Sequence, residues 1–338
     1  MGITLRVQNF RKHRDYTAEF SGNNTVIMGP NGSGKTSLIE AIFVALTSKS
    51  WRSNFDEITR TKSSWWRIDV IYGDEKRIVK YKNGEREFII DGQTFRRLPA
   101  KYKKSVVLFE PSDLNLLYGS PVRRRDYIDK FLGSIDVKYA ANLRRYERIL
   151  KQRNNLLKNG ATRDGLFIWD MQLADQAANI IADRRHLVQQ INKHLTDEYQ
   201  KIAGNYNKIA MEYDFYSDSP AVTRQKILGE LHRNYQHEVT TGHTSVGPHQ
   251  HDLTFLFDGK PAATTASRGE NRSIILALKN IEYKLKKDDT PLILLDDILS
   301  EFDEKHQTNL LKNFGQNQTI ITGVKAPKTA KNLHRIQL

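Results

Sequence analysis

The stretch GPNGSGKT, residues 29–36, decides the fold because it fits the pattern G-x-x-x-x-G-K-[ST] of a phosphate-binding loop. An apolar run that ends at Met28 predicts a strand before the loop, and the spacing of Leu38, Ile42 and Leu46 predicts a helix after it. A strand, a glycine-rich turn and a helix in this order place backbone N–H groups and a helix N-terminus around a phosphate. The sequence therefore predicts an α/β domain that binds the phosphates of a nucleotide.

The side chains of this loop have distinct expected roles. Lys35 is expected to reach the β- and γ-phosphates, and the hydroxyl of Thr36 is expected to ligate Mg²⁺. A nucleoside triphosphate and Mg²⁺ are therefore the expected cofactors. The residues of this stretch that we expect to contact the nucleotide are Gly29, Pro30, Asn31, Gly32, Ser33, Gly34, Lys35, Thr36 and Ser37.

A second stretch, LILLDD at residues 292–297, is an apolar run that ends in paired carboxylates. We expect Asp296 to hold Mg²⁺, largely through water, and Asp297 to orient the water that attacks the γ-phosphate. Alone this pattern is weak, since a buried strand that ends in an acidic turn is common. Together with the phosphate-binding loop it indicates nucleotide hydrolysis, with Lys35, Asp296 and Asp297 as the expected catalytic residues.

The composition fits a globular chain with a polyanionic partner. Of 338 residues, 38% are hydrophobic, and 53 Lys and Arg against 39 Asp and Glu leave a net charge of +14. No apolar run reaches the ~18 residues that a membrane helix needs. The absence of cysteine excludes disulfides, Cys-ligated zinc and thiol catalysis. We therefore expect a cytoplasmic protein, associated with the nucleoid and not with a membrane.

Hydrophobic periodicity divides the chain into an α/β part and a helical part. Short alternating runs with Asn83-Gly84 as a hairpin turn predict a β-meander. Helical spacing between residues 139 and 202 predicts two long helices joined around residues 160–165, and the α/β pattern returns after Gly242. One α/β domain with an inserted helical lobe explains this better than two tandem domains. The expected parts are the N-terminal part of the ATPase head at 1–125, the helical lobe at 126–238 and the C-terminal part of the head at 239–338.

Two short stretches near the paired carboxylates resemble motifs of ABC-class ATPases. Residues 267–269, at the start of a predicted helix, resemble the signature, in which a Ser and a Gly contact the γ-phosphate bound to a second subunit. Residues 300–303 resemble the D-loop, and the order of the four motifs is that of ABC ATPases. The resemblance implies an ATP-dependent homodimer with shared sites. It adds to the expected nucleotide contacts Ser267, Arg268, Gly269 and Asp303.

Three further stretches resemble elements of the RecF family of bacterial recombination-repair proteins. PVRRRDYID at 121–129 is similar to its P-x-x-R-R-x-[FY]-h-D element, GPHQHDL at 247–253 to its G-P-H-x-x-D-L element, and LKQRN at 150–154 to its L-K-Q-R-N helix. The resemblance covers nearly the whole chain and implies an ABC-type ATPase head, like that of SMC proteins, with an inserted α-helical lobe. It also implies binding at DNA gaps or junctions of single and double strands, and partnership with RecR and RecO in loading RecA.

The chain departs from the family pattern at some positions, and alternatives stay open. Glu270 follows the signature where Gln is common, and Ser112 replaces an acidic residue. Hydrolysis is expected to be slow, because the side chain of Asp297 is one methylene shorter than the Glu of fast ABC enzymes. We also expect DNA to stimulate it. The alternatives are an SMC-like structural head with little turnover and a P-loop kinase for a small molecule. The kinase leaves the signature unexplained.

The region expected to contact DNA follows the β-meander. Between residues 123 and 158 there are eleven Lys or Arg against four Asp or Glu. Phosphate contacts from such side chains give affinity without reading sequence, which suits repair at arbitrary sites. The residues expected to contact DNA are Arg123, Arg124, Arg125, Arg144, Arg145, Arg148, Lys151 and Arg153.

Overall fold

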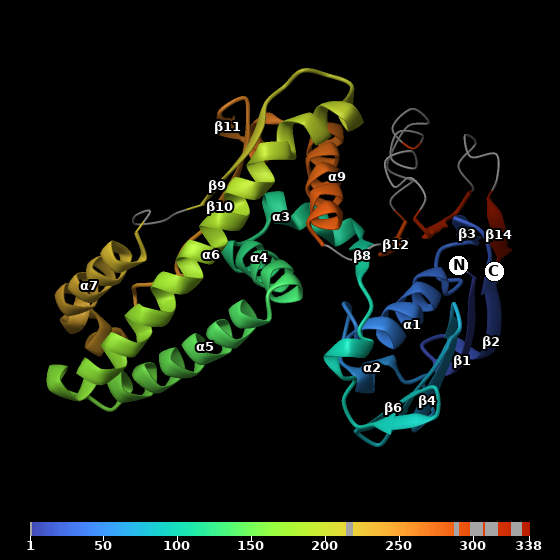
Figure 1. Ribbon diagram of the computed structural model, residues 1–338, viewed down its shortest axis with the longest axis horizontal. Coiled ribbons are helices and arrows are strands. Elements are labelled where there is room, and N and C mark those ends of the chain that lie inside the picture. The colour runs from blue at the N-terminus through green and yellow to red at the C-terminus, as the bar shows by residue number, and fades with distance from the viewer. Residues whose placement is uncertain (1, 214–218, 287–290, 298–306, 308–316, 326–332) are drawn as a thin grey trace. The chain divides into compact units, whose positions relative to one another are not determined.

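The computed structural model describes most of the chain (Figure 1). The described residues are 2–213, 219–286, 291–297, 307, 317–325 and 333–338. They form two compact units. Unit 1 comprises Met1–Asp113 and Glu282–Leu338, and unit 2 comprises Leu114–Ile281. The chain leaves the first unit for the second and then returns, as expected for a head that is interrupted by an inserted lobe.

Unit 1 contains an antiparallel sheet with the strand order β2-β1-β4-β5-β6-β7. Its strands alternate between buried and more exposed residues, so that Leu5 and Val7 of β1 face the core. Asn83 (φ 49°) and Gly84 (φ 86°) form the turn between β5 and β6, which confirms the predicted hairpin. The strands are β1 (Ile3–Phe10), β2 (His13–Phe20), β4 (Trp65–Tyr72), β5 (Glu75–Lys82), β6 (Glu85–Ile90) and β7 (Gln93–Phe95).

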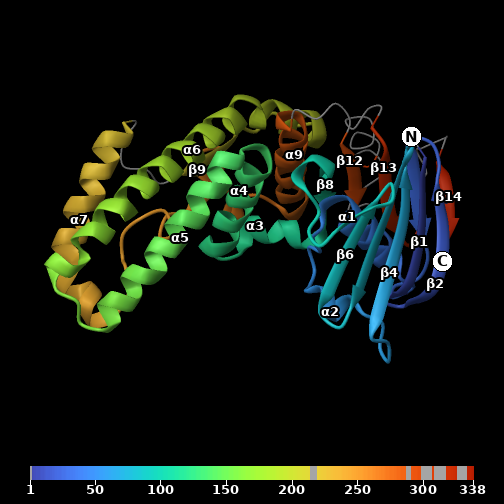
Figure 2. The same ribbon diagram turned by 60° about the horizontal axis from the view of Figure 1, so that its bottom comes forward.

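The second sheet of unit 1 is parallel and has the order β14-β3-β13-β12-β8. Its inner strands β12 and β13 are buried at every position, which is the usual result when both faces of a parallel sheet are covered. Helix α1 packs against both sheets and joins them in one apolar core (Figure 2). The strands are β3 (Asn24–Met28), β8 (Val106–Phe109), β12 (Leu292–Leu295), β13 (Thr319–Gly323) and β14 (His334–Gln337).

Among the described residues of unit 1, the helices other than α1 are short, and the strand order decides where the site lies. The carboxyl ends of β3, β13 and β12 meet at one edge of the parallel sheet, where ligands of such sheets usually bind. The helical segments are α1 (Lys35–Thr47), α2 (Phe55–Ile58) and the 3₁₀ turns η1 (Ala100–Tyr102) and η2 (Pro111–Leu114), the last of which reaches the start of unit 2.

Unit 2 is built around α6, a helix of 41 residues that packs against α5, α7 and β9 (Figure 1). The side chains of Asp136, Thr162 and Ser219 cap the N-termini of α5, α6 and α7. The two long helices predicted on either side of residues 160–165 are confirmed. The helices are α3 (Asn115–Tyr118), α4 (Pro121–Ile135), α5 (Val137–Lys158), α6 (Arg163–Ala203), α7 (Pro220–Thr241), α8 (Ala262–Thr265) and α9 (Arg268–Leu285).

The unit boundaries differ from the expected ones. Residues 239–281, which we expected in the ATPase head, belong to unit 2. The physical reason is backbone pairing, because β10 (Leu253–Phe257) lies antiparallel to β9 (Ile209–Tyr213) and also pairs with β11 (Lys260–Pro261). Asn280 of α9 also donates a hydrogen bond from its amide to the Glu198 carboxylate of α6. Among the described helices of either unit, none is long and apolar enough to cross a membrane.

Candidate active site

The phosphate-binding loop, residues 29–36, connects β3 to α1 at the carboxyl edge of the parallel sheet. Gly34 has a φ of 106°, and a Cβ at this position would lie 2.5 Å from Nε2 of His13, so only glycine fits. The loop is open on its other side, because a Cβ on Gly32 would have no atom within 4 Å. The backbone of the loop is therefore packed against His13 at Gly34 and is accessible to a ligand at Gly32.

The positively charged end of Lys35 curls back over the loop. Its Nζ donates hydrogen bonds to the carbonyl oxygens of Gly29 at 2.8 Å and Pro30 at 3.0 Å, and the residue is only 7% exposed. The hydroxyl oxygen of Ser33 is buried and has no hydrogen-bond partner within the described residues. A cation, an unsatisfied hydroxyl and the first turn of α1 thus converge on one place, which fits the phosphate groups of a nucleotide.

The other predicted loop residues divide into exposed and buried positions. Pro30, Asn31 and Gly32 are exposed at the open side of the loop. Ser37 is buried in the first turn of α1, where its backbone N–H donates to the Gly34 carbonyl at 3.0 Å. The open side of the loop thus lies over residues 30–32.

Asp296 lies at the end of β12 and receives two hydroxyl groups. Thr36 Oγ1 and Thr322 Oγ1 each donate a hydrogen bond to Asp296 Oδ1 at 2.7 Å. Burial raises the pKa of the Asp296 carboxyl, while the hydrogen bonds from the two threonines oppose that shift. Hydroxyl and carboxylate oxygens are ligands that Mg²⁺ prefers, so the Thr36 and Asp296 pair fits the metal expected beside a phosphate.

The second carboxylate, Asp297, is held by its backbone. Its φ is 49°, in the left-handed region that few residues other than glycine adopt, and its N–H donates to Thr322 Oγ1 at 2.9 Å. Thr322 therefore positions both acidic residues, although the sequence did not identify it. The available signal was a hydroxyl residue at the end of the β-branched stretch TIIT, residues 319–322, but only the strand order shows that this stretch lies between β3 and β12.

The turn between β1 and β2 also contacts the loop and was missed from the sequence. The side chains of Lys12 and His13 lie within hydrogen-bond distance of the Gly32 and Gly34 carbonyl oxygens. Burial lowers the pKa of His13. The only sequence signal for this contact was a polar stretch between two short strands, which is common to most hairpins.

The signature residues lie in unit 2, at the N-terminus of α9, and Ser267, Arg268 and Gly269 are all exposed. The Ser267 N–H donates to Glu270 Oε2 at 2.7 Å, and the Glu270 N–H donates to Ser267 Oγ at 3.3 Å. This reciprocal pair is a capping box, so Glu270 has a structural role at the position where Gln is common in the family. The predicted D-loop residue Asp303 lies outside the described residues.

Five of the predicted DNA contacts are accessible. They are Arg123 of α4 and Arg144, Arg145, Arg148 and Lys151 of α5. Residues 144, 148 and 151 are spaced by four and three positions, which places them on one face of the helix. Within the described part of the chain, none of the five forms an ion pair with an acidic side chain. We call these five residues the basic surface.

The expectation that Arg153 contacts DNA is wrong. Its side chain is buried, and its guanidinium forms ion pairs with Asp170 at 2.6 Å and Glu238 at 2.7 Å. Its Nη1 also donates to Thr244 Oγ1 at 2.8 Å. A guanidinium with these partners cannot reach a DNA phosphate without leaving the buried Glu238 carboxylate and the partly buried Asp170 carboxylate uncompensated.

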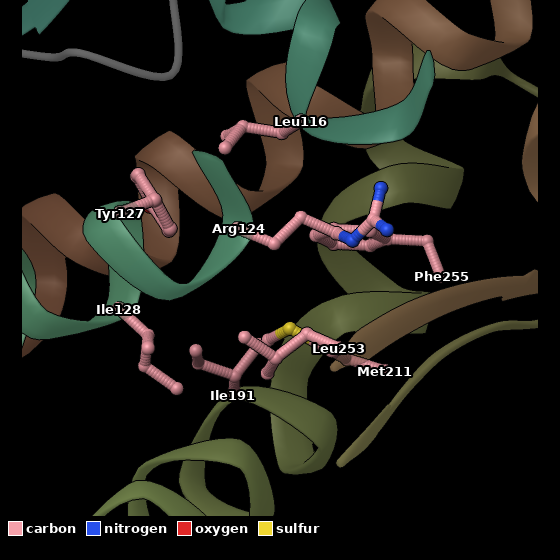
Figure 3. Close-up of a pocket in the computed structure, with 8 residues that line it drawn as sticks. All are labelled: Leu116, Arg124, Tyr127, Ile128, Ile191, Met211, Leu253 and Phe255. Atoms are coloured by element: carbon pink, nitrogen blue, oxygen red, sulfur yellow. The ribbon is translucent and has the colours of Figure 1, made fainter. Parts of the chain in front are cut away.

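Arg124 and Arg125 also make contacts inside unit 2, and their contact with DNA stays a prediction. Two nitrogens of Arg124 donate to the Asp252 carboxylate, each at 2.7 Å, and Arg125 Nη1 donates to the His251 carbonyl at 2.8 Å. Figure 3 shows the stem of Arg124 among apolar side chains at a small pocket. The pocket is lined by Leu116, Arg124, Tyr127, Ile128, Ile191, Met211, Leu253 and Phe255.

The three RecF-like elements of unit 2 meet around the turn at residues 247–252. Arg184 is 2% exposed, donates to both carboxylate oxygens of Asp129, and donates to the Pro248 carbonyl at 2.7 Å. Tyr146 Oη lies 2.5 Å from His249 Nδ1, and His249 Nε2 lies 3.0 Å from the Thr244 carbonyl. Thr244 Oγ1 in turn donates to Asn154 Oδ1 at 2.6 Å, so residues of all three elements take part in one polar network.

Comparisons with known proteins agree with this fold. Residues 4–313 match the family model described as AAA domain. The DNA replication and repair protein RecF of Agathobacter rectalis is 32% identical over 98% of this chain and 94% of that protein. RecF of Lachnoclostridium phytofermentans is 32% identical over 94% of this chain and 91% of that protein.

Comparison with solved structures also indicates a RecF-like fold. The structure described as the recombination mediator protein RecF-ATP in the RecFOR pathway has a TM-score of 0.86 and 25% identity, and the match covers 99% of this chain and 95% of that one. The Smc head bound to the C-winged helix domain of ScpA has a TM-score of 0.52 at 14% identity, which shows a shared fold alone.

The two sheets around α1, the phosphate-binding loop and the paired carboxylates define an α/β ATPase head of the AAA-domain class with a helical unit inserted into it. The matches to RecF proteins, which cover more than nine tenths of both chains at 32% identity, identify the family within this class. The chain belongs to the RecF family of DNA replication and repair proteins.

Proposed function

We propose that this chain is an ATP-controlled DNA clamp. Two copies close on ATP, hold DNA at a gap or at a junction of single and double strands, and open after slow hydrolysis. The observation that carries the proposal is the contact of Thr36 and Thr322 with Asp296 beside an open phosphate-binding loop. The similar RecF structure described with ATP supports ATP as the nucleotide.

In the proposed reaction each residue of unit 1 has one task. Lys35 neutralises phosphate charge, and Thr36 and Asp296 hold Mg²⁺, which stabilises the negative charge on the phosphates. The Asp297 carboxylate orients the attacking water. Its side chain is short and its backbone is fixed by Thr322, so the water is held less closely than a glutamate would hold it. Hydrolysis is therefore slow and serves as a release step.

The second half of each site comes from the other subunit. Ser267 and Gly269 are exposed at the N-terminus of an 18-residue helix, whose partial positive charge suits a γ-phosphate bound to a second copy. In a two-fold dimer both sites form together or neither forms. ATP binding and dimer closure are thus one event.

The basic surface holds the DNA, and its phosphate contacts are independent of sequence. We propose that DNA stimulates hydrolysis, and that the closed dimer works with RecR and RecO to load RecA in the cytoplasm. The printed description of the RecF-ATP structure, which names the RecFOR pathway, supports these partners. The rate of ATP hydrolysis measured with no DNA, duplex, single strand and gapped duplex in parallel tests the DNA dependence. Equal rates in all four samples would favour a structural head or a kinase.

A mixing experiment tests the shared site. Ser267→Arg should block dimerisation and leave ATP binding by the monomer intact, whereas Lys35→Ala should prevent productive ATP binding. Each homodimer then has two defective sites, but the mixed dimer has one normal site. ATPase activity should return on mixing, up to about half the wild-type rate per dimer. ATP-dependent formation of the mixed dimer is measured alongside, because coupling between sites can suppress the rate.

If Ser267→Arg abolishes ATP binding by the isolated monomer, and mixing gives neither activity nor a mixed dimer, the shared site is refuted. Ser267 would then belong to the pocket of its own chain.

A further inference from the structure

Three consecutive residues fasten the turn between β1 and β2 to the nucleotide-binding elements. The first is Arg11, whose guanidinium donates to both carboxylate oxygens of Glu40 on α1, at 3.0 and 2.7 Å. Glu40 is fully buried, and Arg11 has a φ of 52°. This partly buried ion pair fixes the backbone of the turn against the helix that follows the phosphate-binding loop.

The third residue, His13, fixes the other end of the turn. Its Nε2 lies 3.1 Å from the Gly34 carbonyl oxygen, and the residue is 8% exposed. A carbonyl oxygen only accepts, so Nε2 carries the proton in this contact. The ring therefore packs directly on the glycine that precedes Lys35.

The middle residue, Lys12, is held differently. Its Nζ donates to the Gly32 carbonyl at 2.5 Å, yet its side chain is exposed. Within the described part of the chain it has no acidic partner. Its neighbours on both sides are buried or paired, so the backbone places this cation at the open side of the phosphate-binding loop, where Gly32 leaves free space.

We propose that Lys12 binds the phosphate chain of the nucleoside triphosphate, exchanging the neutral Gly32 carbonyl for charged phosphate oxygens. This inference rests on the proposed binding of ATP by residues 29–36. An ionised acceptor forms a stronger hydrogen bond with an ammonium group than a neutral carbonyl does. The flexible stem of lysine allows the exchange while Arg11 and His13 keep the backbone in place.

Binding measured by calorimetry tests the role of Lys12. Lys12→Ala should weaken binding of ATP about 10-fold and leave binding of adenosine unchanged, because adenosine has no phosphate. Lys12→Gln keeps a hydrogen-bond donor for the Gly32 carbonyl but removes the charge, so it should weaken ATP binding as much as alanine does. Lys12→Arg should restore most of the affinity.

Arg14→Ala is the matched control, since it removes one exposed positive charge from the same hairpin. It should change the affinity for ATP less than about 2-fold if contact, rather than the general field, is responsible. Unchanged ATP binding in Lys12→Gln, an equal loss in Arg14→Ala, or an equal loss for adenosine would each overturn the role of Lys12. If the wild-type protein does not bind ATP, the proposed function fails. If the wild-type protein binds ATP and Lys12→Gln binds it equally well, only the role of Lys12 fails, so the two failures are distinguishable.

Discussion

Two glycine-containing turns, residues 29–36 in unit 1 and residues 247–252 in unit 2, differ in what they leave available to a ligand. At the first turn the space above Gly32 is open and the Ser33 hydroxyl is buried without a partner in the described structure. At the second turn Arg184 binds the Pro248 carbonyl, and both ring nitrogens of His249 lie at hydrogen-bond distance from protein oxygens. Arginine and histidine side chains, which are typical of active sites, can thus have a purely structural role. A buried polar group that lacks a hydrogen-bond partner distinguishes a turn that can bind a ligand from a structural one.

The largest expected effect concerns the first turn. Asp297→Asn should lower the rate of ATP hydrolysis by about 10²–10⁴-fold, because the carboxylate that orients water is lost, and should trap a long-lived dimer on DNA. Lys35→Ala should instead fail to bind ATP productively and never dimerise. Single-turnover hydrolysis and ATP-dependent dimerisation separate the two lesions. A normal rate in Asp297→Asn would remove this residue from the water-positioning role.

The network behind the second turn should control stability. Arg184→Met leaves Asp129 without its main partner, and we expect unit 2 to lose about 3–5 kcal/mol of unfolding free energy. Arg148→Met on the exposed face of α5 is the control and should change stability by less than about 0.5 kcal/mol. Urea denaturation monitored by circular dichroism measures both. Equal midpoints for the two variants would show that the network contributes nothing to stability.

The basic surface gives a smaller effect that is confined to DNA. Neutralising Arg144, Arg145 and Arg148 together should weaken duplex binding and lower the slope of log affinity against log salt by ~0.9 for each lost phosphate contact. ATP binding should survive. Arg153→Met should lower stability and leave that slope unchanged, because its guanidinium is buried. An unchanged salt slope in the triple variant would show that this face of α5 does not contact DNA.

The smallest expected effect is the difference in stability loss when a glycine of each turn is replaced by alanine. Gly247→Ala should cost about 2 kcal/mol or more, because its φ of 128° disfavours L side chains and the new Cβ would lie 2.6 Å from Tyr146 Oη. Gly32→Ala should cost about 1 kcal/mol, since its φ of 78° is left-handed but the space is empty. Thermal unfolding of each variant measures the difference. A larger loss for Gly32→Ala would contradict the description of the first turn as open.

Local patterns predicted the elements well, because strands, turns and helices depend on neighbours in the chain. The strand and helix around the phosphate-binding loop, the Asn83-Gly84 hairpin and the start of α9 are examples. Long-range pairing was not predictable. No local signal shows that Glu238 neutralises Arg153, so that arginine looked like the surface arginines around it.

The proposed nucleotide site shows the same division. Lys35, Thr36 and Asp296, which the sequence predicted, belong to contiguous motifs. Thr322 and Lys12 reach the site only through the strand order and the hairpin contact, which periodicity does not encode. Residues 239–281 were assigned to the wrong part because their attachment depends on the pairing of β10 with β9.

The strand order also determines how long β3 remains without its partner strands while the chain is synthesised on the ribosome. β3 pairs with β13 on one side and β14 on the other, and both partners are encoded late. At ~5–20 residues per second, residue 323 is made roughly 15–60 s after residue 36. Strands β4 to β7 of the antiparallel sheet and all of unit 2 are translated in the meantime. The nascent chain therefore contains β3, an apolar strand, with both edges unpaired for much of its synthesis. We expect it to need protection from aggregation until β13 emerges.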